Sequence, residues 1–246
     1  MYLTKFLFNQ KPSAINVKVV VILLLIIYIV ASSANCYAQL RINAVDLDRI
    51  PQKKVRSLVK QQYENGAVFF SDLKPTCYSE QDSNRYSFQK TTHIIKEKIH
   101  KVWNKLKCLK PRDEYSGRMV SFGFLYSKRL NKLLYNDDDF KEIEEGQILF
   151  LNLKLLGGVK NLGVAIEVTK VDDANNIIQF CYVENGMTEG TQQVKLIENK
   201  EGNTVISQES RYRNRSKFRE KRLYPFFHQK AVSELQANLS KFIEGL

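Results

Sequence analysis

The C-terminal part of the chain combines alternating segments with one long amphipathic helix. From residue 149 to residue 212, apolar and polar side chains alternate in segments separated by turn sequences, which predicts an antiparallel meander with one apolar face. From Leu223 to Leu246, apolar residues recur every three or four positions, and Pro225 stands where only a first helical turn accepts it. A single helix of that length must cover an apolar surface, and the meander offers one.

The segments before the meander complete an α+β pattern. Residues 86–94 are predicted to form a strand, and residues 95–106 a helix that contains Val102 and Trp103. Phe122 and Phe124 alternate with small residues in a further predicted strand, and residues 130–135 are expected to form a short helix. The acidic run of residues 137–139 lacks the spacing of a calcium loop.

Residues 1–38 have the pattern of a secretory signal peptide. A lysine-containing leader without acidic residues precedes an apolar run over residues 19–31, and Cys36 and Ala38 place small side chains where a signal peptidase cuts. The apolar run is shorter than the roughly 20 residues that span a bilayer as a helix. We therefore expect export to a periplasmic or extracellular space with cleavage after Ala38. A lipid anchor at Cys36 and an uncleaved membrane anchor are the alternatives.

The mature chain is expected to contain an appendage and one main domain. Residues 39–85 are predicted to form a helical appendage and a connector, because Val55, Leu58 and Val59 make a short apolar stripe that Gly66 ends. Residues 86–246 form the predicted main domain. Cys77 could bridge Cys108 in an oxidising compartment, whereas Cys181 is expected to be a small buried side chain inside a strand.

The formal net charge of +12 includes three lysines of the leader, so the mature chain has a net charge of 12 − 3 = +9, which favours contact with anionic surfaces. The densest cluster has two interpretations: a solvated strand end, or a surface for an anionic membrane or envelope polymer. Nucleic acid is not an expected partner of an exported protein. The cluster consists of Arg211, Arg213, Arg215, Lys217, Arg219, Lys221 and Arg222.

Candidate catalytic groups are few. None of the three histidines is near a recognisable nucleophile motif; His100 is expected at the surface, and His228 at the rim of a core or at a cavity mouth. Glu209 and Arg211 share a strand face, and we expect a surface ion pair unless that face points inward. No cysteine and histidine spacing matches a zinc site, so neither a metal nor a cofactor is expected.

The order of these segments resembles the START-like superfamily, also called helix-grip, birch-pollen-allergen-like or SRPBCC. The matching segments are residues 92–106 with the Val102-Trp103 pair, residues 144–151, 164–182 and 201–212, and the terminal helix. The likeness covers residues 86–246 and is nearest to uncharacterised bacterial branches, so it implies a fold and no activity. That fold is α+β, with a curved antiparallel sheet wrapped around the C-terminal helix.

In this superfamily a cavity lies between the sheet and the terminal helix, and the segment before Tyr86 would partly cap it. The resemblance implies a non-catalytic binder or carrier of a hydrophobic small molecule or lipid. A cyclase- or isomerase-type enzyme and an envelope-surface binding protein are the alternatives, and a packed core is the alternative to the cavity. The expected ligand-binding side chains are Phe122, Phe124, Leu151, Leu153, Phe180, Tyr182, Tyr212, Phe227, Leu235 and Leu239.

Overall fold

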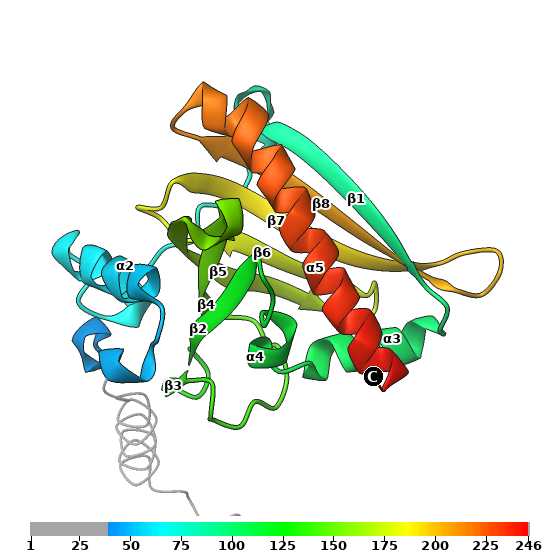
Figure 1. Cartoon of the computed structure of the whole chain (residues 1–246), viewed down its shortest axis with the longest axis horizontal. Helices are drawn as coiled ribbons and strands as arrows, with labels where there is room; N and C mark the ends of the chain where they lie inside the picture. Colours follow the sequence, from blue (N-terminus) through cyan, green and yellow to red (C-terminus); the bar gives the residue numbers. More distant parts are fainter. Residues whose placement is uncertain (1–38, 246) are drawn as a thin grey trace, which may run out of the picture. The chain divides into compact units, whose positions relative to one another are not determined.

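The computed structural model describes residues 39–245, so the predicted signal peptide lies outside the described residues. Its centre is one eight-stranded antiparallel sheet with the strand order β1-β8-β7-β6-β5-β4-β2-β3 (Figure 1). The first strand thus pairs with the last, and the meander fills the middle. The strands are β1 (Ser87–Ile95), β2 (Val120–Ser127), β3 (Lys132–Leu134), β4 (Gln147–Leu155), β5 (Lys160–Asp172), β6 (Ile177–Tyr182), β7 (Thr188–Glu198) and β8 (Thr204–Asn214).

The sheet is flanked by four α-helices and several single turns within residues 39–245. None of the helices in this range is long and apolar enough to cross a membrane. The α-helices are α2 (Lys53–Glu64), α3 (Ile99–Cys108), α4 (Pro111–Glu114) and α5 (Tyr224–Glu244), and a π-helical turn η6 (Arg219–Leu223) precedes α5. The 3-10 turns are η1 (Ile42–Ala44), η2 (Leu47–Arg49), η3 (Phe70–Asp72), η4 (Glu80–Arg85) and η5 (Leu156–Gly158).

Helix α5 lies across one face of the sheet (Figure 1). Pro225 stands in its first turn, as predicted, because a proline there loses no helical hydrogen bond. Leu239 and Ile243 are buried from α5 in the main core, together with Val102 and Trp103 of α3. The predicted fold class is therefore confirmed: an α+β, helix-grip arrangement in which an antiparallel sheet packs on a long C-terminal helix.

The prediction of a short helix over residues 130–135 is wrong. This segment returns as strand β3 and pairs antiparallel with β2, with Leu134 opposite Leu125. Asn131 adopts a left-handed backbone conformation with φ of 47°, which makes the tight turn between the two strands. Helix α3 begins at Ile99 and not at Ile95, because β1 continues through Ile95 in its pairing with β8.

A bulge in β2 reverses the predicted direction of one aromatic side chain. The pairing with β4 shifts between Phe122 and Phe124, so that Gly123 is the extra residue. The side-chain amide of Gln52 donates to the carbonyl oxygen of Phe122 across 2.7 Å. Phe122 stays in the main core, but Phe124 points to the other face and stacks on Phe150 with ring centroids 4.3 Å apart. The prediction that Phe124 lines the cavity is therefore wrong.

Residues 40–73 cover that other face and build a second core with it. Ile50, Val55 and Phe70 are fully buried there. Helix α2 approaches β5 so closely that a Cβ at Gly163 would lie 2.5 Å from the carbonyl oxygen of Lys54, which requires glycine at this position. Since the two cores share the sheet, the appendage and the sheet form one compact unit over residues 39–246.

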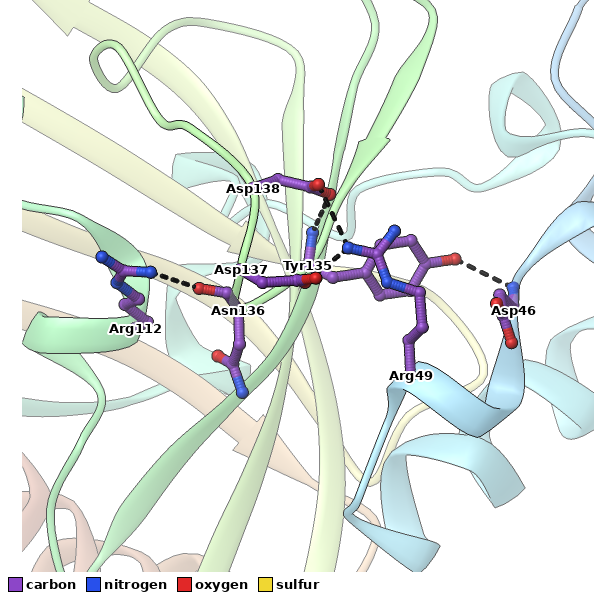
Figure 2. A network of polar contacts seen from close by, with 7 residues as sticks. All are labelled: Asp46, Arg49, Arg112, Tyr135, Asn136, Asp137 and Asp138. Atoms are coloured by element: carbon purple, nitrogen blue, oxygen red, sulfur yellow. Dashed lines mark hydrogen bonds and ion pairs between the residues drawn. The ribbon is translucent and has the colours of Figure 1, made fainter.

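A polar network joins the appendage to the loop after β3 (Figure 2). The backbone N–H of Asp46 donates to the Tyr135 hydroxyl across 2.8 Å. The Arg49 guanidinium lies 4.1 Å from the centroid of the Tyr135 ring and pairs with the carboxylates of Asp137 and Asp138. The acidic run that lacked calcium spacing thus contributes the anions of a cation–π and ion-pair site.

A disulfide bond joins the connector to the sheet, and it is not the predicted one. Cys77 bridges Cys181 of β6, with Cα atoms 5.0 Å apart, whereas Cys108 is free and exposed. The connector reaches Cys181 because the backbone N–H of Thr76 donates to the carbonyl oxygen of Tyr182 across 2.6 Å. Cys181 is fully buried, as predicted, but as an oxidised residue.

Candidate functional site

A cavity of about 410 Å³ lies between the sheet and α5. This volume is within the range of roughly 300–1,000 Å³ that small-molecule sites occupy. In the described residues the core between the sheet and α5 is therefore hollow and not fully packed. Most of its lining side chains are apolar, and they come chiefly from β4, β5, β6 and α5, with Leu58 and Gln62 from α2.

Seven of the ten side chains expected from the sequence line this cavity. Phe122 packs in the main core without lining the cavity, and Phe124 lies in the second core. Tyr212 is buried beneath Tyr224, with ring centroids 3.6 Å apart, and donates to the carbonyl oxygen of Glu220. Ligand binding by the seven stays a prediction; they are Leu151, Leu153, Phe180, Tyr182, Phe227, Leu235 and Leu239.

A chain of hydrogen bonds forms one polar part of the cavity wall. The hydroxyls of Tyr182 and Tyr224 are 2.8 Å apart, and the Tyr224 hydroxyl is also 2.8 Å from Ser210 Oγ. Gln192 donates to the Tyr182 hydroxyl across 2.6 Å and accepts from the Gln208 amide across 3.1 Å. Burial raises the pKa of Tyr182 to about 12 and that of Tyr224 well above its ordinary value. Both phenols are therefore protonated at neutral pH and act as hydrogen-bonding groups.

His228 lies at this end of the cavity with unsatisfied ring nitrogens. Its ring stacks on Tyr224 with centroids 4.9 Å apart. Both nitrogens are buried, and neither has a hydrogen-bond partner among residues 39–245. Burial lowers the pKa of His228 to about 4, so the neutral ring offers one N–H donor and one acceptor. Because an unpaired buried polar group costs free energy, a ligand that satisfies this ring would gain from it.

A carboxyl group lines the cavity from α4. Glu114 and the following Tyr115 both contribute to the lining. The side-chain amide of Asn238 in α5 donates a hydrogen bond to the Glu114 carbonyl oxygen across 2.8 Å. Burial raises the pKa of the Glu114 carboxyl to about 7, and a hydrogen bond from Tyr115 limits the rise. Gln236 of α5 adds a buried side-chain N–H group without a partner among the described residues. Neither Glu114 nor Gln236 was expected from the sequence, because no motif or spacing singles them out.

Glu114→Gln is expected to stabilise the protein at alkaline pH. The folded-state pKa of about 7 lies above the ordinary value of 4.5 for a glutamate carboxyl, so the stability linked to this carboxyl is complete below pH 4.5 and is lost as pH rises through 7. A glutamine cannot ionise. We expect the free energy of unfolding of Glu114→Gln to exceed the wild-type value by up to about 2 kcal/mol at pH 8 and to match it near pH 4. Because the Glu114 side chain is partly exposed, solvent screening keeps the difference below the full value of the pKa shift.

The measurement is urea unfolding of both proteins across this pH range. His228 loses stability in the opposite direction, as pH falls from 6.5 towards 4, but it does so in both proteins and cancels in the comparison. Glu64→Gln at the exposed end of α2 is the matched control. An equal difference between Glu114→Gln and wild type at every pH would contradict this assignment.

The remaining polar candidates lie outside the cavity. Glu209 and Arg211 form the predicted ion pair, at 3.4 Å, and Lys90 also pairs with Glu209 at 2.9 Å. His93 hydrogen-bonds Ser240 across 3.0 Å. Within residues 39–245, no three His, Cys, Asp or Glu side chains are grouped closely enough to hold a metal ion.

The basic cluster divides into paired and unpaired cations. Arg211 lies between the rings of Tyr78 and Phe88, and Arg213 pairs with Glu189. Lys217 pairs with Glu220 at 3.4 Å. For the other four, no carboxylate is within ion-pair distance among the described residues; they are Arg215, Arg219, Lys221 and Arg222.

No protein-family model matches the chain, and no curated protein matches it. Solved structures with a similar fold include a major latex-like protein from Panax ginseng, with 10% identity over 63% of this chain and 96% of that chain and a TM-score of 0.45. A protein from Thermus thermophilus has 13% identity over 65% and 98% of the two chains and a TM-score of 0.48.

Norcoclaurine synthase from Thalictrum flavum, solved in complex with dopamine and hydroxybenzaldehyde, has 12% identity over 70% of this chain and 96% of that chain, with a TM-score of 0.47. At such identities and scores these likenesses carry no conclusion about binding or activity. The fold is established by the strand order and by the position of α5.

Proposed function

We propose that this protein binds an apolar small molecule or a lipid in the cavity between the sheet and α5, and that it acts as a binder or carrier. The observation that supports this best is the cavity itself, about 410 Å³ with a mainly apolar lining. Enclosure of an apolar ligand would remove its surface from water, which is the main source of affinity in such sites.

The polar groups indicate where a functional group of the ligand would lie. His228 offers a donor and an acceptor that nothing among residues 39–245 satisfies, beside the hydroxyls of Tyr224 and Tyr182. A hydroxyl, amide or amine on an otherwise apolar molecule matches this combination, because each can pair with a neutral imidazole. The rest of the ligand would contact the leucines and phenylalanines of the lining.

We also propose that the protein works in an exported, periplasmic or extracellular compartment. The Cys77–Cys181 disulfide supports this, because structural disulfides persist mainly in oxidising compartments. The signal-peptide pattern of residues 1–38 indicates the same exported compartment.

A second candidate function is proton-transfer catalysis of the cyclase or isomerase type. Glu114 favours it, because a carboxyl in an apolar cavity with a pKa of about 7 can both give and take a proton near neutral pH. The two functions differ in the fate of the ligand. Recovery of the ligand unchanged after prolonged incubation would support the carrier, and turnover that Glu114→Gln abolishes would support the enzyme.

The binding proposal is tested by fluorescence titration with N-phenyl-1-naphthylamine, a neutral apolar probe that carries one N–H group. We expect a saturable rise in fluorescence that corresponds to one site per chain, because the two aromatic ring systems enter the cavity. A signal that grows without saturation would show that the probe meets only surface patches, and it would contradict the proposal.

A further inference from the structure

The cavity opens at one end of the molecule. Five of its lining residues are exposed, and they come from three neighbouring segments: η5 with the start of β5, the turn between β6 and β7, and η6. The Arg219 guanidinium donates to the Met187 sulfur across 3.5 Å, which brings the β6–β7 turn and η6 together. We call this opening the mouth; the five residues are Leu156, Lys160, Met187, Arg219 and Leu223.

Large apolar side chains are exposed around the mouth. Val159, next to the mouth residue Lys160, is 89% exposed, and Leu156 and Phe218 are each 64% exposed. Half of all exposed large apolar side chains in residues 39–245 belong to the mouth segments, to Phe218 directly before η6 and to the first turn of α5. A cluster of exposed apolar side chains on the surface of a folded domain indicates a contact with another apolar partner.

The charge around these side chains is positive. Arg215, Arg219, Lys221 and Arg222 have no carboxylate within ion-pair distance in the described part of the chain. The single acidic residue among them, Glu220, is 3% exposed and points inward, where it accepts from the backbone N–H of Asn214 and from the Ser87 hydroxyl. Because the Glu220 carboxylate is buried in these hydrogen bonds, no carboxylate from residues 215–222 lies on the outer surface beside the four cations.

We propose that the mouth docks on an anionic lipid bilayer. Exposed apolar side chains would enter the interface, and the surrounding Arg and Lys side chains would contact lipid phosphates, a combination of two signals that is typical of stable peripheral binding. The docking stands on the surface alone. Exchange of the cavity ligand with the bilayer at the same place rests in addition on the proposed function.

The test is co-sedimentation of residues 39–246, one compact unit, with vesicles of phosphatidylglycerol and phosphatidylcholine in equal parts. We expect binding that falls more than about tenfold on pure phosphatidylcholine, and likewise between about 0.1 M and about 1 M salt, where the screening length drops from about 10 Å to about 3 Å. Salt-independent binding, or equal binding to both vesicles, would overturn the proposal.

Variants outside the cavity lining separate the mouth from the rest of the surface. The double variants Val159→Ser/Phe218→Ser and Arg215→Glu/Arg222→Glu should each lose more than about tenfold in vesicle binding. The matched controls lie at the opposite end of the sheet and should bind like wild type: Ile94→Ser/Ile197→Ser and Lys195→Glu/Lys200→Glu. Equal losses in mouth and control variants would contradict docking through the mouth.

The two proposals fail separately. Vesicle binding without saturable binding of N-phenyl-1-naphthylamine would support the docking surface and remove the cavity function. Probe binding without vesicle binding would support the cavity function and overturn docking on a bilayer. It would indicate that the exposed apolar side chains contact a protein and not a bilayer.

Discussion

Ala231→Phe is expected to weaken the binding of N-phenyl-1-naphthylamine more than about hundredfold, which corresponds to about 2.7 kcal/mol. Ala231 lines the cavity from α5, so the substitution places a phenyl ring in the space that a ligand would occupy. The ring would lie in an existing apolar space. We therefore expect the free energy of unfolding to change by less than about 1 kcal/mol, within the tolerance of cores for substitutions that fit.

The matched control is Ala237→Phe on the exposed side of the same helix. It makes the same chemical change without entering the cavity and should leave probe binding unchanged. Fluorescence titration measures affinity, and urea unfolding confirms that both variants are folded. If Ala231→Phe bound the probe as well as Ala237→Phe does, the probe would not occupy the cavity and this account of the site would be wrong.

Cys77→Ser is expected to lower the free energy of unfolding by about 3–4 kcal/mol. The disulfide closes a loop between residues 104 positions apart, so the unfolded chain loses much conformational freedom while the bridge is intact. The bridge also holds the connector against the end of β6, where Pro75 pairs with Val183, the residue that follows this strand. Urea unfolding without reductant measures the effect.

Cys108→Ser is the control for this prediction, because Cys108 is free and exposed. It should change the free energy of unfolding by less than about 0.5 kcal/mol. Reductant should remove most of the difference between wild type and Cys77→Ser. Equal stability of Cys77→Ser and wild type under oxidising conditions would show that the bridge does not form.

The elements with a regular period were predictable from the sequence. The alternation through residues 149–212 and the helical period after Leu223 indicated the meander and α5, because long periodic segments reflect one buried face. Seven of the ten side chains that the resemblance to the START-like superfamily implied for the cavity do line it. The reversal of Phe124 did not, since a bulge at Gly123 changes the period by a single residue.

Contacts between distant segments were not predictable in the same way. Cys77 meets Cys181 because Tyr78 and Thr76 bond to β7 and β6, and no spacing in the sequence encodes that pairing. The close approach of α2 to β5 at Gly163 is a second contact of this kind.

The polar groups of the cavity were only partly accessible to sequence reasoning. His228 was placed at a core rim or a cavity mouth, and it lines the cavity. Glu114 was missed because α4, Pro111–Glu114, has only four residues, which is too short for a helical period to appear in the sequence. A titratable group acquires a functional environment from packing, which a linear pattern does not contain.

The central claim is that the cavity holds an apolar ligand. Native mass spectrometry tests this claim most directly. The protein measured is residues 39–246, purified from an oxidising expression host, and its mass is compared before and after solvent extraction. The account predicts a stoichiometric apolar adduct on the wild-type chain that extraction removes, that Ala231→Phe lacks and that Ala237→Phe keeps. A wild-type mass that equals the bare chain, and that stays unshifted after incubation with a panel of lipids and small apolar molecules, would contradict it.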